Sequence, residues 1–185
     1  MRAPRSDAVR NRQRLIDTAT EAFATGGTGV PLEAIAARAG VSIGTLYNHF
    51  SDRDGLVEAV LGDALDQLTA VADAAAERDD PWEAFESLVL GTCELQAGDR
   101  AVADILGRRY PPPTGVIHAA CAHLMDRFVE IIERGKRAGV LRDDLVVDDI
   151  GPIMWANARI AEASGTESPD AWRRHLGFVL DGLRT

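Results

Sequence analysis

A short segment, GVSIGTLYNHF at residues 40–50, carries side chains that could do chemistry. Thr45, Tyr47, Asn48 and His49 bring hydroxyl, amide and imidazole groups close together in the sequence. Such groups donate hydrogen bonds to phosphate oxygens, and an amide can also contact the edge of a base. The segment therefore predicts a surface that binds nucleic acid. A solvated amphipathic helix is the alternative that these residues leave open.

Two short helices joined by a tight turn are predicted around this segment. The first covers about residues 31–39 and ends at Gly40, and the second starts with Ser42 as its N-cap and runs to about His49. This is the pattern of a helix-turn-helix, whose second helix enters the DNA major groove with its N-terminal residues leading. Many helical proteins contain such a turn, so the spacing alone is a weak signal.

The predicted contacts with DNA follow from the chemistry of each side chain. Gly44 lets the backbone approach closely, Ile43 could meet a thymine methyl group, and Asn48 could contact a base edge. Arg53, in the first turn of the next helix, could clamp a phosphate together with the free amides there. The predicted set is Ser42, Ile43, Gly44, Thr45, Tyr47, Asn48, His49 and Arg53.

Helical patterns run through almost the whole chain, so we predict an all-α fold of about nine helices. Apolar residues recur at spacings of three and four, and polar caps such as Asp80 mark helix starts. A cap-plus-acid signal from Ser51 to Asp54 is expected to start the fourth helix. The helices are expected at about residues 7–25, 31–39, 42–49, 51–77, 81–97, 100–108, 114–138, 148–163 and 169–183.

Charge divides the 185-residue chain, whose net charge is −9. Residues 1–55 hold seven arginines against six acidic residues, whereas the remainder holds 13 basic and 23 acidic residues. An arginine-rich start suits a part that approaches DNA, although arginines that only keep a tail soluble are the alternative. We expect a helix-turn-helix DNA-binding domain at residues 1–52 and a helical effector-binding and dimerisation domain at residues 53–185.

Other kinds of chemistry find little support. His118, Cys121 and His123 are of metal-ligand types, but only the first two share a helical face and no carboxylate completes a set. The glycine-rich run at residues 25–29 follows a helix and lacks the Lys-Ser/Thr pair of a phosphate loop. The usual hydrolase, zinc-protease and dinucleotide motifs do not occur. We predict no metal, no cofactor and no enzymatic activity.

Cysteine content and hydropathy indicate the compartment. Cys93 and Cys121 form neither a CxxC motif nor a disulfide framework. The charged N-terminal segment is not followed by an apolar run, and no run approaches the roughly 20 apolar residues of a membrane span. A reduced, cytoplasmic protein without a membrane partner is expected.

Residues from about 10 to 62 resemble the signature of the TetR family of transcriptional regulators. The shared features are AFATGG, LEAIAARAGVS, GTLYNHF, a basic residue at Arg53 and a Leu-Val-x-Ala-Val run. The resemblance implies a three-helix DNA-binding domain followed by a ligand-binding and dimerisation domain. It also implies an anchoring role for Arg53, where lysine is more usual. The implied phosphate and base contacts are at Ser42, Thr45, Tyr47, Asn48 and His49.

One departure from the family pattern lies at the start of the second helix. Many members carry a Thr or Ser there that holds phosphate, whereas this chain has Val30 and Pro31. Thr28 or a backbone amide would have to replace that contact.

A dimer is expected because one short helix contacts too few base pairs to find an operator. Two copies could read the two half-sites of a palindrome, and the resemblance also implies a four-helix interface. Two apolar stripes near the C-terminus could form it, although they could equally face the protomer's own core. The predicted interface residues are Ile153, Asn157, Trp172, Leu176, Val179, Leu180 and Leu183, with Ile150, Met154 and Ala161 in the same stripes.

A small-molecule pocket is expected among the middle helices, over about residues 82–160, although each candidate could be plain core. Arg159 draws most interest, because a buried cation needs a partner, either an acidic ligand or an internal acid such as Glu162. The candidates are Phe85, Cys93, Tyr110, His118, Cys121, Met125, Phe128, Trp155 and Arg159.

Together these features predict a DNA-binding transcriptional regulator. The specific hypothesis is a dimeric repressor that a small-molecule effector releases from its operator, with the long fourth helix linking the pocket to the DNA-binding part. An effector can act only through its different affinities for the two states. A helical protein-interaction module and a regulator that binds DNA without an effector are the alternatives.

Overall fold

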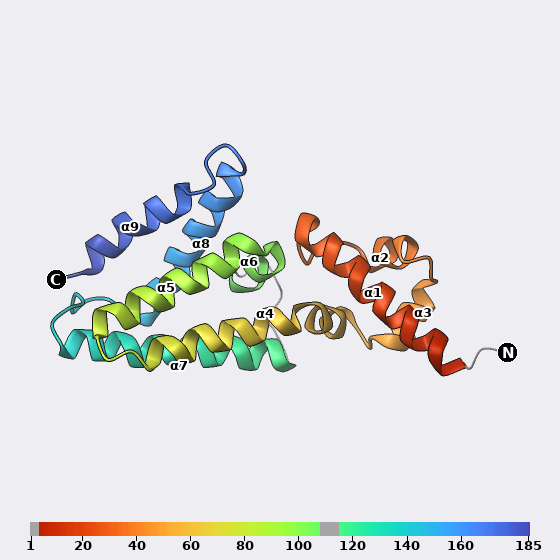
Figure 1. The fold of residues 1–185 in the computed structure, drawn as a ribbon, viewed down its shortest axis with the longest axis horizontal. Coiled ribbons are helices and arrows are strands. Elements are labelled where there is room, and N and C mark those ends of the chain that lie inside the picture. Colours follow the sequence, from red (N-terminus) through yellow and green to blue (C-terminus); the bar gives the residue numbers. More distant parts are fainter. Residues whose placement is uncertain (1–3, 108–114) are drawn as a thin grey trace. The chain divides into compact units, whose positions relative to one another are not determined.

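Nine α-helices make up residues 4–107 and 115–185, which a computed structural model describes (Figure 1). Within these ranges the only β-type pairing is an isolated bridge between Leu141 and Arg184. The prediction of an all-α fold is confirmed. The helices are α1 (Pro4–Gly26), α2 (Leu32–Arg38), α3 (Ile43–His49), α4 (Arg53–Ala76), α5 (Pro81–Gly98), α6 (Arg100–Leu106), α7 (Gly115–Arg137), α8 (Val147–Ser164) and α9 (Ala171–Leu183).

Two compact units, Met1–Asp63 and Ala64–Thr185, divide the chain. The division falls inside α4, so the first unit includes the start of that helix. Leu56, Val57 and Leu61, in this first part of α4, are buried.

In the first unit, α1, α2 and α3 pack on one another around buried apolar side chains. The turn between α2 and α3 depends on Gly40, whose φ of 68° is in the left-handed region that disfavours other residues. There the Val41 N–H donates to the Ala36 carbonyl at 3.0 Å, which closes the end of α2. The predicted end of the second helix at Gly40 is therefore confirmed.

Local caps set where most helices begin. Ser42 accepts a hydrogen bond from the Thr45 N–H, and Asp80 accepts one from the Glu83 N–H, as expected. The predicted start of α4 at Ser51 is wrong. The Asp52 carboxylate accepts from the Gly55 N–H at 2.8 Å, so Asp52 is the cap.

Two further helix starts differ from expectation. Helix α1 begins at Pro4, before the predicted start near Asp7. Pro31 lies at the N-cap position of α2, one residue before the first turn in which we expected it.

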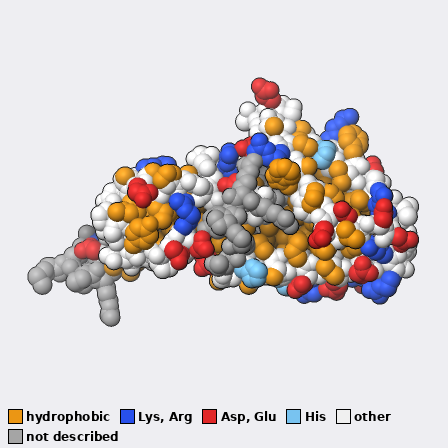
Figure 2. All heavy atoms as spheres, turned by 180° about the vertical axis from the view of Figure 1, so that it is seen from behind, with side chains coloured by type: hydrophobic (Ala, Val, Ile, Leu, Met, Phe, Trp, Pro, Cys, Tyr) orange, Lys and Arg blue, Asp and Glu red, His pale blue; other side chains and the backbone are white. Residues whose placement is uncertain are grey.

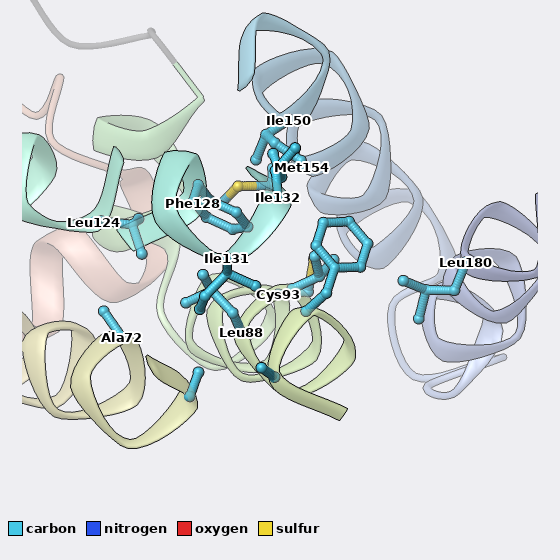
Figure 3. Packing of buried hydrophobic residues seen from close by; sticks show 14 of the residues in the cluster. Ala72, Leu88, Cys93, Leu124, Phe128, Ile131, Ile132, Ile150, Met154 and Leu180 are labelled. Carbon is cyan, nitrogen blue, oxygen red and sulfur yellow. The ribbon is translucent and has the colours of Figure 1, made fainter. Parts of the chain in front are cut away.

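The second unit encloses a core built from α4, α5, α7, α8 and α9. Helix α5 packs on α7 and α8, and α8 packs on α9. Figure 3 shows side chains from these helices converging, and it labels Ala72, Leu88, Cys93, Leu124, Phe128, Ile131, Ile132, Ile150, Met154 and Leu180.

Candidate functional site

Helix α3 is held on the first unit by its apolar side. Leu46 and Phe50 are buried, and the Arg12 guanidinium lies over the Phe50 ring, 5.2 Å from its centroid. A cation over an aromatic face is attracted by the ring electrons. The end of α3 is thereby tied to α1, which fixes the helix without using its polar residues.

The predicted DNA contacts of α3 lie at the protein surface. Tyr47 is 49% exposed, although it is a large aromatic residue, and Asn48 beside it is also exposed. The hydroxyls of Ser42 and Thr45 are 2.9 Å apart and share a hydrogen bond at the N-terminal end of the helix. The exposed members of the set are Ser42, Gly44, Tyr47 and Asn48, and the partly buried ones are Ile43, Thr45 and His49. Their contacts with DNA stay a prediction.

Arg53 has partners that the sequence reasoning missed. Its Nη1 donates to the Thr28 carbonyl at 2.7 Å and to the Val30 carbonyl at 2.8 Å. The guanidinium thus ties the first turn of α4 to the loop between α1 and α2. No local pattern in the sequence names these two carbonyls as partners of Arg53. A phosphate contact by Arg53 stays a prediction.

Thr28 itself is only 2% exposed, so its hydroxyl does not reach the surface. The suggestion that Thr28 replaces the missing phosphate contact at the start of α2 is therefore wrong. A backbone amide stays the candidate for that contact.

The predicted effector residues differ widely in burial, and their role in binding an effector stays a prediction. Phe85, Cys93 and Phe128 are buried in the core, Cys121 and Met125 are partly buried, and His118 and Trp155 are exposed. Tyr110 lies outside the described residues. The interpretation of Arg159 as a buried cation is wrong, because its side chain is 48% exposed and pairs with Glu162, the internal acid named as its alternative.

Buried polar side chains in the second unit are more informative. The Thr92 hydroxyl donates to the Leu88 carbonyl at 2.7 Å, and the Asn157 amide oxygen lies 3.3 Å from His175 Nδ1. The Asn157 side chain also hydrogen-bonds Cys93. Burial raises the pKa of Cys93 to about 12. Gln96 differs, because neither polar atom of its buried side chain has a hydrogen-bond partner. Sequence reasoning passed over Gln96, although it follows Thr92 at helical spacing.

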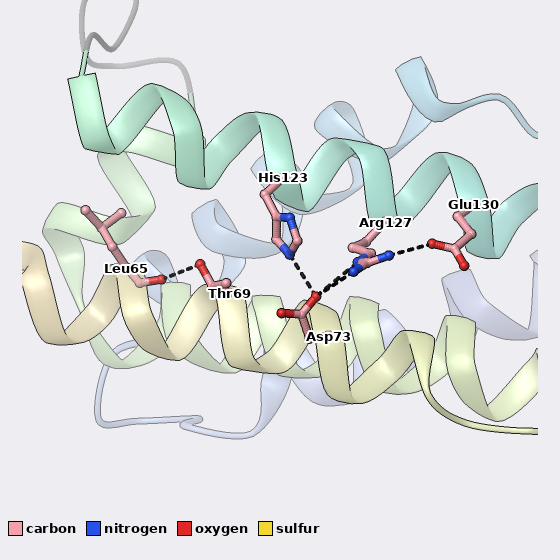
Figure 4. A network of polar contacts seen from close by, with 6 residues as sticks. All are labelled: Leu65, Thr69, Asp73, His123, Arg127 and Glu130. Carbon is pink, nitrogen blue, oxygen red and sulfur yellow. Dashed lines mark hydrogen bonds and ion pairs between the residues drawn. The ribbon is translucent and has the colours of Figure 1, made fainter.

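A polar network joins α4 to α7 (Figure 4). His123 Nε2 lies 2.8 Å from Asp73 Oδ1, Arg127 Nε donates to the same oxygen at 3.0 Å, and Arg127 also donates to Glu130. The hydrogen bond with His123, followed by that from Arg127, holds the pKa of Asp73 below its ordinary value of 3.8. His123, considered in the sequence only as a metal ligand, is thus a partner of a carboxylate.

The predicted dimer stripe is largely internal. Trp172, Leu176, Leu180 and Asn157 are at most 6% exposed within one protomer, because they pack into its own core. Their assignment to a protomer-protomer surface is therefore wrong, and the core alternative holds for them. Ile153, Val179 and Leu183 are partly exposed, and their interface role stays a prediction.

Other residues of the same two helices are exposed instead. Trp155 of α8 is 53% exposed and Phe178 of α9 is 62% exposed. Some exposed residues beside them are small or apolar, namely Pro152 and Ala156 on α8 and Gly177 on α9. Others are charged, and the Arg174 guanidinium lies over the Phe178 ring, 5.4 Å from its centroid. Figure 2 shows one face of the second unit, on which apolar side chains lie at the surface among charged ones.

Comparison with known families decides the identity of this arrangement. A family model described as bacterial regulatory proteins of the tetR family matches residues 15–60, and a model of the SbtR-like transcriptional regulator C-terminal domain matches residues 80–185. The chain belongs to the TetR family. It is a helix-turn-helix, DNA-binding transcriptional regulator, as the resemblance implied.

Relatives of this TetR-family protein are also named as regulators. The regulator SrpR of Pseudomonas putida is 30% identical over 146 residues, which is 77% of this chain and 67% of that protein. The repressor KstR2 of Mycolicibacterium smegmatis is 27% identical over 193 residues, covering 96% of this chain and 93% of that one.

Solved structures share the fold. The ketosteroid transcriptional regulator KstR2 of Mycobacterium tuberculosis aligns with a TM-score of 0.69 at 24% identity, over 94% of this chain and 95% of that one. A TetR protein from Mycobacterium vanbaalenii aligns at 0.52 and 30% identity, over 99% and 100%. None of the described helices has the length and apolar character needed to cross a bilayer.

Proposed function

We propose that this TetR-family protein is a homodimeric repressor, that α3 of each copy reads one half of a palindromic operator, and that a small-molecule effector releases it. The observation that carries the proposal is that α3 has one buried apolar side and one exposed polar side. Leu46 and Phe50 fasten the helix, whereas Tyr47 and Asn48 are exposed with nothing from the described chain covering them. A recognition helix in the major groove requires such a division.

The dimer in this proposal uses the exposed sides of α8 and α9. Trp155 and Phe178 are large apolar side chains at the surface of helices whose other sides are packed in the core, and the Arg174 guanidinium lies over the Phe178 ring. Aromatic residues and arginine are enriched at the centre of protein interfaces. Two helices from each copy would then form a four-helix interface.

Effector release is supported by the buried polar groups of the second unit and by the relatives, which include named repressors. A coupling of about 1–3 kcal/mol between effector and operator, or ~5–150-fold in affinity, is typical of such regulators. Helix α4 belongs to both compact units, so it is the element through which we expect the effector to act.

Selection of bound sequences from random duplex DNA tests the proposal, with the purified protein at two salt concentrations. We expect an enriched palindrome whose half-sites lie about one helical turn apart, ~34–36 Å. The double variant Tyr47→Ala/Asn48→Ala is the control and should enrich nothing. Absence of enrichment with the unaltered protein, together with absence of binding at low salt, would contradict the proposal.

A further inference from the structure

Gln96, in the last turn of α5, is the one buried side chain in the described part of the protein with both a donor and an acceptor unpaired; Arg100 and Arg134 each have a single unpaired Nε. Its side chain is 3% exposed, and neither Nε2 nor Oε1 has a hydrogen-bond partner. Buried polar atoms are almost always paired, because an unpaired one loses its bonds to water and gains nothing in return. An amide with both a donor and an acceptor unpaired therefore indicates that something outside the chain completes it.

The other buried amide and hydroxyl of this unit differ from Gln96. Thr92 bonds the carbonyl of its own helix, and Asn157 bonds His175 and Cys93. Their polar groups are complete within the protein, so they do not require a ligand. Gln96 thus differs from them in lacking hydrogen-bond partners, although all three side chains are buried.

The surroundings of Gln96 indicate what kind of group could complete it. Leu88, Thr92 and Gln96 follow one another at a spacing of four, so they share one face of α5, and Leu88 is part of the apolar core. Besides Gln96, the buried polar residues of the second unit are Thr92, Asn157 and the carboxylate Asp104, and none of them is a cation. Arg100, one turn beyond Gln96, also has a buried and unpaired Nε, but its Nη2 is already paired with Glu162 at 2.9 Å. An anionic ligand would therefore find no uncompensated counter-charge at Gln96 among the described residues.

We propose that Gln96 is the polar anchor of the effector site and that the effector is an uncharged, mainly apolar molecule with a hydrogen-bond donor and acceptor side by side, as in a lactam or carboxamide. Such a group matches both atoms of the glutamine amide at once. This proposal rests on the proposed function, because a molecule bound at Gln96 is an effector only if the protein is a regulator. Binding at Gln96 can nevertheless be measured without DNA.

The test uses the full-length protein with caprolactam, whose ring presents an N–H and a carbonyl on one edge of an apolar body. Cyclohexanone offers only the acceptor, and cyclohexanecarboxylate is charged, so these are the comparison compounds. Binding is followed by the NMR shifts of the Gln96 side-chain amide and by the change in Tm. Gln96→Leu removes the anchor, and Gln67→Leu makes the same change at an exposed site on α4.

We expect caprolactam to shift the Gln96 amide signals and to raise Tm, with cyclohexanone weaker and the carboxylate without effect. Gln96→Leu should weaken caprolactam binding by about tenfold or more, because both hydrogen bonds to the amide are lost, whereas Gln67→Leu should leave it unchanged. Without ligand, Gln96→Leu should have a Tm at or above that of the unaltered protein, because it removes an unpaired buried group.

Three results would overturn the inference: equal responses of the unaltered protein and Gln96→Leu, no response to any compound, or a marked loss of Tm in ligand-free Gln96→Leu. The last would mean that the amide already has structural partners. Each outcome is independent of the DNA selection. If caprolactam binds at Gln96 but no operator is found, the proposed function fails and the site stands; if an operator is found without binding at Gln96, the reverse holds.

Discussion

At the scale of single residues, Arg53 connects parts of the first unit that are distant in sequence. Its guanidinium bonds the carbonyls of Thr28 and Val30, directly before α2 begins. A displacement of the first turn of α4 would therefore act on the loop from which the helix-turn-helix starts. Arg53 is in this sense a positioning residue for α3, whether or not it also contacts phosphate.

Arg53→Gln should lower the free energy of unfolding by about 1–3 kcal/mol, because the two carbonyls lose a charged donor in a partly buried place. Urea unfolding measures this, and Arg38→Gln, which breaks only the exposed ion pair with Glu21, is the control that should change little. If Arg53 were solely a phosphate contact, stability would stay constant and the salt slope of DNA binding would fall by about 0.9.

Tyr47 and Asn48 are adjacent and exposed, but their chemistry predicts different effects on DNA binding. Tyr47→Ala should weaken binding to all sequences and reduce the salt dependence, as expected for a phosphate contact. Asn48→Ala should relax the preferred sequence, at a cost of about 1–3 kcal/mol for a good bidentate contact. Competition binding with operator variants separates the two effects. An unchanged preference in Asn48→Ala would remove that residue from the base contacts.

At the scale of helices, α4 and α5 approach closely at Gly91. A Cβ added there would lie 2.7 Å from Cγ1 of Val71, which is closer than carbon atoms pack. Gly91→Ala should therefore destabilise the protein by about 1–3 kcal/mol through overpacking. Gly62→Ala is the matched control, because nothing lies within 4 Å of its added Cβ and alanine should gain about 0.5–1 kcal/mol in a helix.

Adding Val71→Ala to Gly91→Ala makes room for the new methyl group, so the double variant should lose less than the sum of the two single variants. Urea unfolding of all four proteins gives this coupling. Strict additivity would mean that α4 and α5 adjust without strain.

The network of Asp73 with His123 and Arg127 predicts a pH dependence. The pKa of Asp73 is lowered in the folded state, so its ionised form adds stability above its ordinary pKa of 3.8. That contribution is lost as the pH falls through the folded pKa. Asp73→Asn should thus be less stable than the unaltered protein near pH 7, and the difference should shrink below pH 3.8.

Urea unfolding as a function of pH measures this difference, with Asp66→Asn on the exposed side of α4 as the control. A difference between Asp73→Asn and the unaltered protein that stays constant with pH would show that the carboxylate charge has no part in joining α4 to α7.

How far the sequence predicts these features depends on the separation of the partners. Caps such as Ser42 and Asp80 act on residues three positions away, so the helix starts there were predictable. The starts of α1, α2 and α4 were each wrong by a few residues at most. The partners of Arg53 and Asp73 are far away in the chain, and no local pattern names them.

Apolar stripes pose a different difficulty, because periodicity shows that a face is buried but not what buries it. Trp172, Leu176 and Leu180 form such a stripe and pack on the protomer's own core. The exposed Phe178, between two of them in sequence, does not belong to the stripe and was overlooked for that reason. The sequence does place one large apolar residue, Phe178, outside the stripe, and that position could have indicated an exposed apolar side chain.

At the scale of the whole molecule, the proposed function requires two copies, and Phe178→Asp should separate them. A carboxylate in the middle of an apolar interface is strongly disfavoured, so the variant should sediment as a monomer while keeping its helical circular dichroism. Its affinity for the full palindrome should fall by more than tenfold, because only one half-site is read.

Val129→Asp is the matched control for this experiment, since Val129 is an exposed apolar residue of α7. It should remain dimeric and bind the palindrome normally. A dimeric Phe178→Asp variant would place the interface elsewhere.

The buried thiol described above has a practical consequence for observing this molecule in solution. Cys93 is enclosed and its pKa is about 12, so at neutral pH it offers almost no thiolate to an alkylating dye. Burial also raises the pKa of Cys121 on α7, but this thiol is only partly buried and is the more accessible of the two. A maleimide fluorophore should therefore attach once per protomer, at Cys121, without any mutagenesis. In the proposed dimer, energy transfer between the two dyes would then report how the copies rearrange when DNA or effector binds.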